Sequence, residues 1–362
     1  MLMKRICLLA LTIAFAGMTS CSSSSSSSKH SAYVTVPQTN TVIGYRVDNT
    51  SGHLSVISGS PFPTGTSPAS ITVHPSNKFA YVANQGEADV SLYTVDSTKG
   101  TLSEVTPRTV TGFNPVALAI DSSGSFLFVA NQASNSISVF SINSGSGALA
   151  DVAGSPFPTG PSPVALAVSP SGKFLYVATS NVASVSGYSI TAGTGALQPI
   201  PGSPFPVGNG PFSLAVDPSE RFVYVINSAA GDFLLLKINS VTGALTAVPG
   251  PAFTAGKNPI SVTVDSTGKF LYIANQGSGD VSAYSIDSAT GIPTSITGSP
   301  FAAGSEPVFV VIDSSGKFLF VGNQSSKNIT EFTIDMSTGA LTKVSSEAPS
   351  TGSAPSSMST TK

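Results

Sequence analysis

The chain has 362 residues, of which 41% are hydrophobic but only 9% are charged. An average soluble domain has about 25% charged residues, so this chain is poor in the groups that form salt bridges and acid–base sites. Its net charge is −2 and its 16 basic residues are scattered, which argues against a nucleic-acid partner because such proteins carry a basic stripe. Two cysteines are too few for a disulfide scaffold or a cysteine-based zinc site.

The first thirty residues have the features of an export signal. Lys4 and Arg5 precede an apolar run over residues 6–18, which is shorter than the roughly 20 residues that a membrane-spanning helix needs. The small residues before Cys21 and the serines after it resemble the lipobox of bacterial lipoproteins. This resemblance implies cleavage before Cys21 and lipidation of that residue, with an ordinary signal peptide and an incidental cysteine as the alternative.

Three segments are therefore expected. Residues 1–20 are the predicted lipoprotein signal peptide, residues 21–31 are the lipidated cysteine with a Ser-rich tether, and residues 32–362 are the folded domain. The lipid on Cys21 would anchor the protein in a membrane of the bacterial cell envelope. The outer membrane, or the periplasmic or extracellular face, is the expected location.

One motif repeats along the rest of the chain. An aromatic residue followed by a β-branched residue recurs seven times, at a spacing of 47 or 48 residues. The pairs are Tyr33-Val34, Tyr81-Val82, Phe128-Val129, Tyr176-Val177, Tyr224-Val225, Tyr272-Ile273 and Phe320-Val321. In one repeat, residues 162–209, turns rich in Gly, Pro and Ser separate four short runs typical of β-strands. Four-stranded sheets of about 40–50 residues that cover one another in a ring form a β-propeller, so the sequence predicts an all-β, seven-bladed propeller with four antiparallel strands per blade.

The two ends of the chain are predicted to share one blade. The first repeat begins at its second strand, residues 32–36, whereas residues 352–360 align with residues 65–73, where another repeat has its first strand. A C-terminal strand within residues 356–361 would therefore complete the first blade and close the ring. Closure removes open sheet edges that invite aggregation, and we expect a monomer.

The repeats also resemble those of a known family. The segments that carry the resemblance are Tyr-Val-Ala-Asn at 81–84, Phe-Val-Ala-Asn at 128–131, Tyr-Ile-Ala-Asn at 272–275, Ser-Gly-Lys-Phe-Leu-Tyr at 171–176 and Gly-Ala-Leu at 195–197. They are similar to the YVTN repeats of the seven-bladed lactonase-like propellers, a family that includes 6-phosphogluconolactonases and carboxymuconate cyclases. The resemblance covers residues 32–362 and implies a central cleft in which His, Arg and Glu carry out lactone chemistry. A fold alone does not specify chemistry, however.

The residue types that lactone hydrolysis needs are scarce in this sequence. The reaction calls for a general acid or base and for a cation near the developing oxyanion. The three histidines, His30, His53 and His74, lie in the tether or in turns on the face opposite the expected ligand face. Among the arginines, only Arg108 is expected to approach the ligand face. Lys257 and Glu306 lie just before the prolines that open two first strands, so they are weak candidates for an acid–base pair, with two solvated loop charges as the alternative.

Aspartates end four of the predicted first strands, on the face opposite the expected ligand face. They are Asp121, Asp217, Asp265 and Asp313. Aspartate at such a turn usually accepts hydrogen bonds from its own backbone. We therefore expect neither a metal site nor a cofactor.

A polar residue ends the second strand in six of the repeats. These residues are Asn84, Asn131, Thr179, Asn227, Asn275 and Asn323, and glutamine follows at positions 85, 132, 276 and 324. One interpretation is a neutral polar ring around the mouth of the central channel, suited to sugar hydroxyls or to a polar peptide. The other is that the asparagines merely cap the strands.

Two functions remain open. The first is an envelope-anchored, non-catalytic module that binds a protein, a peptide or a glycan. The alternative is a secreted lactone hydrolase of the 6-phosphogluconolactonase-like family. The scarcity of histidine and arginine and the predicted export favour the first function, whereas the family resemblance favours the second.

Overall fold

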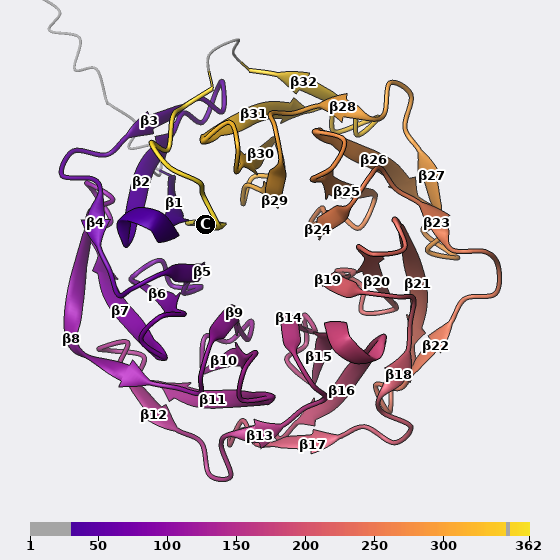
Figure 1. Ribbon diagram of the computed structural model, residues 1–362, viewed down its shortest axis with the longest axis horizontal. Coiled ribbons are helices and arrows are strands. Elements are labelled where there is room, and N and C mark those ends of the chain that lie inside the picture. Colours follow the sequence, from indigo (N-terminus) through magenta and orange to yellow (C-terminus); the bar gives the residue numbers. More distant parts are fainter. Residues whose placement is uncertain (1–29, 345–347) are drawn as a thin grey trace, which may run out of the picture.

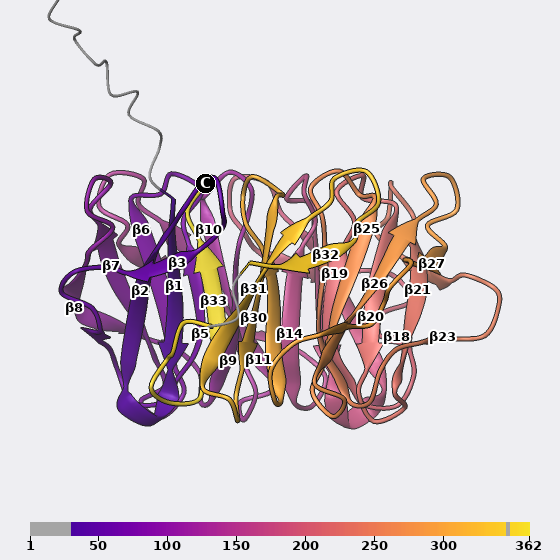
Figure 2. The same ribbon diagram turned by 90° about the horizontal axis from the view of Figure 1, so that it is seen from above.

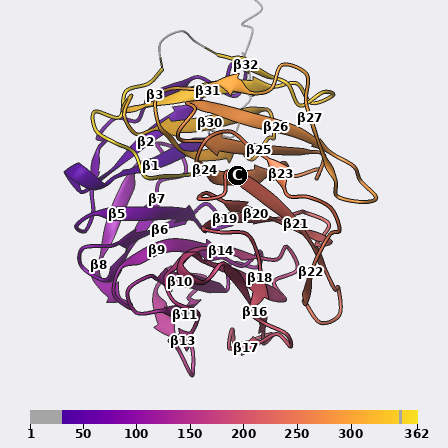
Figure 3. The same cartoon turned by 45° about the vertical axis from the view of Figure 1, so that its right-hand side comes forward.

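Seven antiparallel sheets surround a central axis in the computed structural model, which describes residues 30–344 and 348–362 (Figure 1). The sheets stand side by side like the blades of a propeller, and the oblique view shows them stacked face to face around the axis (Figure 3). This confirms the predicted all-β, seven-bladed propeller. No helix in the described ranges is both long enough and apolar enough to cross a membrane.

Each blade has four main strands, which run from the axis to the periphery. We number the blades from the one that contains β1. The innermost strands of blades 1 to 7 are β33 (Ser357–Thr360), β5 (Pro68–Val73), β9 (Pro115–Ile120), β14 (Pro163–Val168), β19 (Pro211–Val216), β24 (Pro259–Val264) and β29 (Pro307–Ile312). The second strands are β1 (Ser31–Val36), β6 (Phe79–Asn84), β10 (Phe126–Asn131), β15 (Phe174–Thr179), β20 (Phe222–Asn227), β25 (Phe270–Asn275) and β30 (Phe318–Asn323).

The outer half of each blade is less regular. The third strands are β2 (Thr41–Val47), β7 (Asp89–Val95), β11 (Ser136–Ile142), β16 (Ser184–Ile190), β21 (Asp232–Ile238), β26 (Asp280–Ile286) and β31 (Asn328–Ile334). The fourth strands are β3 (Leu54–Val56), β8 (Leu102–Val110), β12 (Leu149–Asp151), β17 (Leu197–Pro199), β22 (Leu245–Ala247), β27 (Pro293–Ser295) and β32 (Leu341–Lys343). Two single-turn 3₁₀ helices, η1 (Pro37–Thr39) and η2 (Ser180–Val182), follow the second strands of blades 1 and 4.

Five blades have an additional strand of two residues that the sequence did not indicate. These strands are β4 (Phe62–Pro63), β13 (Phe157–Pro158), β18 (Phe205–Pro206), β23 (Phe253–Thr254) and β28 (Phe301–Ala302), and each pairs with the third strand of its blade. The Ser-Pro-Phe segment was expected only to loop to the next repeat. Blade 2 lacks this segment, and the nine-residue β8 pairs along β7 instead, with a shift in register between Val90 and Leu92.

The two chain ends close the ring, as predicted. The C-terminal strand β33 pairs with β1, so that Val34 lies opposite Met358. The backbone N–H of Ser31 donates to Oγ1 of Thr361 at 2.9 Å, and the N–H of Thr361 donates to the carbonyl of Ser31 at 2.8 Å. In the side view β33 lies beside β1, with the C-terminus on one face of the ring and η1 on the other (Figure 2).

The hydrophobic core lies between neighbouring blades. Each cluster of buried side chains draws residues from two adjacent sheets, for example Tyr176 and Val185 from blade 4 with Val223 and Leu236 from blade 5. Second strands are buried on both faces, which explains why their sequences are continuously apolar rather than alternating.

Candidate functional site

A pocket of about 540 Å³ lies at one end of the central channel. Its polar lining consists of Gln38, Gln132, Ser228, Asn258, Gln276, Gln324 and Ser356. Its apolar lining consists of Pro37, Val116, Val164, Phe212, Ile260, Val308, Ala354 and Pro355. We call this pocket the amide mouth. It is on the face that bears η1, opposite the C-terminus (Figure 2).

The backbone places the glutamines at the mouth by the same device in several blades. The residue before the proline that opens a first strand has a positive φ, which is 58° at Asn114 and 50° at Asn258. Its carbonyl accepts the N–H of the residue that follows a second strand, at 2.9 Å for both Gln132 and Gln276. Each glutamine is thereby fixed where the loop turns toward the channel.

Side-chain amides link neighbouring blades around the mouth. Asn258 donates from Nδ2 to Oε1 of Gln276 at 2.6 Å, and Gln276 donates from Nε2 to Oε1 of Gln324 at 3.4 Å. On the other side, Asn114 donates to Gln132 at 2.8 Å, and Gln132 donates to Oγ of Ser162 at 3.1 Å. The result is a belt of neutral groups that can both donate and accept hydrogen bonds.

The wall below this belt is apolar. It is formed by the residues that directly follow the first-strand prolines, among them Val116, Ile260 and Val308. Phe212 is the largest of them, and 45% of its surface is exposed. None of the residues that line the amide mouth carries a charge. The pocket therefore suits a neutral ligand that presents hydroxyl groups together with an apolar face.

The asparagines that end the second strands do not line this mouth. Asn84, Asn131, Thr179, Asn227, Asn275 and Asn323 have no exposed surface. Asn84 shows why: its Nδ2 donates to Oδ1 of Asp89 at 2.7 Å and to Oγ of Ser91 at 2.9 Å, both within its own blade. The predicted polar ring is thus corrected: the asparagines hold the strand ends, and four of the residues that follow them line the mouth, namely Gln132, Ser228, Gln276 and Gln324. The glutamines that follow three of the asparagines were the sequence signal for it.

Arg108 is paired at the periphery of blade 2 rather than at the channel. It lies on the outermost strand β8, where Nε donates to Glu104 at 2.7 Å and Nη1 donates to Glu87 at 2.5 Å. The hydrogen bond to Glu104 raises the pKa of Arg108, and the hydrogen bond from Thr66 is the main cause that lowers the pKa of Glu87. Nearby, burial raises the pKa of Asp89. The positive charge of Arg108 is therefore already balanced.

The structure does not join Lys257 and Glu306. Neither residue lines the amide mouth, and the ion pairs in the described part of the chain do not include them. Lys257 is exposed, and Oε2 of Glu306 accepts a hydrogen bond from Ser325 at 2.5 Å. Glu306 is the positive-φ residue before Pro307, a position that Asn258 takes in blade 6, whereas Lys257 lies one residue earlier in its own loop.

The histidines have structural partners. His74 is buried, with Nδ1 2.7 Å from Oγ of Ser76 and Nε2 2.9 Å from the carbonyl of Gly124. It is a turn residue, as the sequence indicated. His53 contacts Glu331 across the boundary of blades 1 and 7 at 3.1 Å, and the buried Glu331 also accepts the N–H of Leu54 at 2.7 Å. Burial raises the pKa of Glu331.

The four aspartates on the opposite face hold their turns. In Asp121, Oδ1 accepts the backbone N–H groups of Ser125 and Phe126 at 2.8 and 2.7 Å, and the corresponding contacts recur at Asp217 and Asp265. No cluster of three or more His, Cys, Asp or Glu side chains suited to a metal ion occurs within residues 30–344 and 348–362.

Comparisons with known proteins agree with this architecture. The sequence matches the family model described as lactonase, 7-bladed beta-propeller, over residues 23–166 and 165–355. No curated protein matches the sequence significantly.

Similar solved structures include two proposed 6-phosphogluconolactonases. The protein from Bacteroides uniformis has a TM-score of 0.80 at 18% identity and covers 92% of this chain and 99% of its own. The protein from Bacteroides fragilis has a TM-score of 0.80 at 21% identity, and the match covers 94% of this chain and 99% of that protein. The periplasmic gluconolactonase of Pseudomonas aeruginosa has a TM-score of 0.78 at 20% identity, and the match covers 92% of this chain and 99% of that protein. At these identities the likeness is one of fold.

Proposed function

The chain belongs to the seven-bladed β-propeller lactonase family, and we propose that it uses the family scaffold as a binding module without catalysis. The proposed ligand is neutral and rich in hydroxyl groups, such as a glycan. The amide mouth is the proposed site. The observation that carries the proposal is its lining, in which amide side chains and apolar residues occur without a carboxylate, a cation or a histidine.

The chemistry of the lining fits a sugar. Carboxamides both donate and accept hydrogen bonds, so Gln132, Asn258 and Gln276 can each satisfy hydroxyl groups in either sense. The exposed ring of Phe212 offers an apolar surface for the non-polar face of a pyranose. A phosphorylated sugar fits less well, because phosphate recognition relies on Arg or Lys side chains, and the pocket has neither.

The second candidate function is lactone hydrolysis, which the family favours. A hydrolase needs a positioned acid or base and donors for the oxyanion. Arg108, one of the charged candidates outside the mouth, is paired with Glu87 and Glu104. Lys257 and Glu306 remain the groups to examine first if hydrolysis is detected.

We further propose that lipid on Cys21 holds the propeller at the cell envelope. Cys21 lies outside the described residues, and the proposal rests on the basic, apolar and small residues that precede it. A fatty-acid probe fed to cells should label the wild type and not Cys21→Ala. Equal labelling of the two proteins would contradict it.

Saturation-transfer NMR with neutral gluco-, galacto- and manno-oligosaccharides tests binding at the mouth. We expect transfer from the protein to at least one of these sugars, with loss of the signal in Phe212→Ala and in Gln276→Ala. Val241→Ala is the matched control, because Val241 is 85% exposed and does not line the mouth. The absence of transfer to every sugar, or transfer that survives Phe212→Ala, would overturn the proposal.

A further inference from the structure

Blade 4 has the buried Thr179 at the end of its second strand, where blades 2, 3, 5, 6 and 7 have a buried asparagine and blade 1 has Val36. In blades 2 and 3 the asparagine that ends the second strand bridges two hydroxyl groups. Oδ1 of Asn84 accepts from Oγ1 of Thr64 at 3.0 Å, and its Nδ2 donates to Oγ of Ser91 at 2.9 Å. Blade 3 repeats this arrangement, with Asn131 between Thr111 at 3.1 Å and Ser138 at 2.9 Å.

In blade 4 both hydroxyl groups are kept but the amide between them is not. Thr179 replaces the asparagine, and its own hydroxyl contacts Ser184, with the carbonyl oxygen and Oγ each at 2.9 Å. Thr159 and Ser186 occupy the positions of Thr64 and Ser91. Oγ1 of Thr159 is buried beside the hydroxyl of Tyr188 but has no partner at full hydrogen-bond geometry. A buried hydroxyl in this state costs free energy that a suitable partner would recover.

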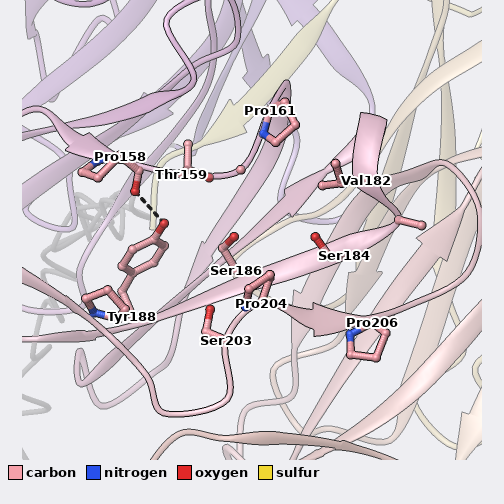
Figure 4. Close-up of a pocket in the computed structure, with 13 residues that line it drawn as sticks. Pro158, Thr159, Pro161, Val182, Ser184, Ser186, Tyr188, Ser203, Pro204 and Pro206 are labelled. Atoms are coloured by element: carbon pink, nitrogen blue, oxygen red, sulfur yellow. Dashed lines mark hydrogen bonds between the residues drawn. The ribbon is translucent and has the colours of Figure 1, made fainter.

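A pocket of about 560 Å³ opens at these same residues (Figure 4). Thr159, Ser184 and Ser186 line it, and Pro161, Val182 and Pro204 form apolar walls. The hydroxyl of Tyr188 already donates to the carbonyl of Pro158 at 2.8 Å. The lining contains no Asp, Glu, Lys, Arg or His, so the pocket suits an uncharged ligand.

The smaller side chain also leaves more room in blade 4. A methyl group added at Gly65, beside Asn84, would lie only 2.5 Å from the asparagine side chain. At Gly160, the equivalent position of blade 4, the nearest atom is a methyl carbon of Thr179 at 3.3 Å. Val182, from η2, is 46% exposed at the entrance.

We propose that this pocket is a second binding site, distinct from the amide mouth, for a small uncharged molecule that carries a carboxamide or acetamido group. The ligand amide would replace the missing asparagine amide. Its carbonyl would accept from Thr159 and its N–H would donate to Ser186, while its apolar part would lie against Pro161 and Val182. An acetamido sugar and the side chain of asparagine in a peptide share this chemistry.

Saturation-transfer NMR on the purified protein tests the proposal with three probes. N-acetylglucosamine and N-acetylasparagine amide distinguish the two sources, and glucose, which has no amide, is the negative probe. We expect transfer to the acetamido methyl group or to the asparagine probe, and none at this site to glucose. Transfer to neither amide probe would overturn the proposal.

Thr179→Asn is the decisive variant, because it supplies the amide from within the protein. Asparagine ends the second strand in five other blades, so the variant should melt no lower than the wild type while losing the amide signal. Ser186→Ala should weaken binding by about tenfold through loss of one acceptor. All probes are measured in the Phe212→Ala background, so that sugar binding at the amide mouth does not contribute, and Val241→Ala, at an exposed residue that lines neither pocket, should leave the amide signal unchanged. Equal transfer in the wild type and Thr179→Asn would contradict this site.

Discussion

The phenolic hydroxyl of Tyr224 in blade 5 donates a hydrogen bond of 2.8 Å to the carbonyl oxygen of Gly291 in blade 6. The same contact joins Tyr33 to Gly100, Tyr81 to Gly147, Tyr176 to Gly243 and Tyr272 to Gly339. Burial raises the pKa of Tyr224, so this hydroxyl stays protonated and remains a donor. The repeating tyrosine and the glycine of the following repeat are thus two halves of one contact between blades.

Gly291→Ala should destabilise the fold more than an alanine at a matched glycine. Gly291 has a φ of 75°, and a Cβ there would lie 2.8 Å from the ring of Phe222. Gly193 has a φ of 77° with no atom within 4 Å of an added Cβ. Both variants lose about 1–2 kcal/mol from the left-handed backbone, and only Gly291→Ala adds a cost of about 1–3 kcal/mol for overpacking.

Denaturant midpoints of the two glycine variants provide the measurement. A larger loss for Gly291→Ala than for Gly193→Ala assigns the difference to the packing between blades. Equal losses would mean that the ring of Phe222 moves aside without cost.

Sequence periodicity predicted most of this fold. The spacing of 47 or 48 residues identified the blades, and the missing first strand of the first repeat identified the closure by β33. Both are local or repeated patterns, so one chain contains several copies of the same evidence. The two-residue strands were missed because a run as short as Phe205–Pro206 has no periodicity of its own.

The site was harder to predict, because it depends on which way single side chains point. The predicted ring was wrong by one residue. The asparagine at the end of a second strand is buried in its blade, whereas the next residue lines the channel mouth in blades 3, 5, 6 and 7. The contact between His53 and Glu331 joins residues 278 apart in sequence and exists only because the ring closes. No pattern within one repeat could indicate it.

Removal of residues 356–362 should cost several kcal/mol of the free energy of unfolding. The truncation deletes β33, the buried Met358 and the hydrogen bonds between Ser31 and Thr361, and it leaves the inner edge of β1 unpaired. Denaturant unfolding of the truncated and full-length chains measures the loss. A chain that ends at Thr361 is the control and should match the full-length protein, since it keeps every residue of β33. Equal midpoints for all three chains would contradict closure by β33.

Glu331→Gln should change how stability depends on pH. Burial holds the pKa of Glu331 above the ordinary value of 4.5, so the folded state binds this proton more tightly than the unfolded chain does. The stabilising contribution of Glu331 is then present at low pH and is lost as the pH rises through its folded-state pKa. Relative to Glu331→Gln, the wild type should therefore lose stability as the pH rises above 4.5.

Asp335→Asn gives the opposite sign and serves as the control for this pH dependence. Hydrogen bonds from Ser337 and Thr338 lower the pKa of Asp335 below the ordinary value of 3.8. Relative to this variant, the wild type should lose stability as the pH falls below 3.8. Thermal melts across pH 3 to 8 compare the three proteins. A constant difference between the wild type and Glu331→Gln would show that Glu331 has the same pKa in both states.

The protein should not hydrolyse 6-phosphogluconolactone or gluconolactone at an enzymatic rate. General acid–base catalysis is worth about 10²–10⁴-fold and an oxyanion donor about 10²–10³-fold, and the lining of the amide mouth supplies neither a titratable acid or base nor a cation. Lactones hydrolyse spontaneously, so the rate is measured at several protein concentrations against a reaction without protein. A rate that rises linearly with protein and saturates with substrate would contradict the prediction. Lys257→Ala and Glu306→Ala would then be the first variants to assay, because each residue lies in a loop that leads into a first strand and neither forms an ion pair within the described residues. If both variants kept the rate, Gln276→Ala would test whether the amide mouth itself orients the lactone.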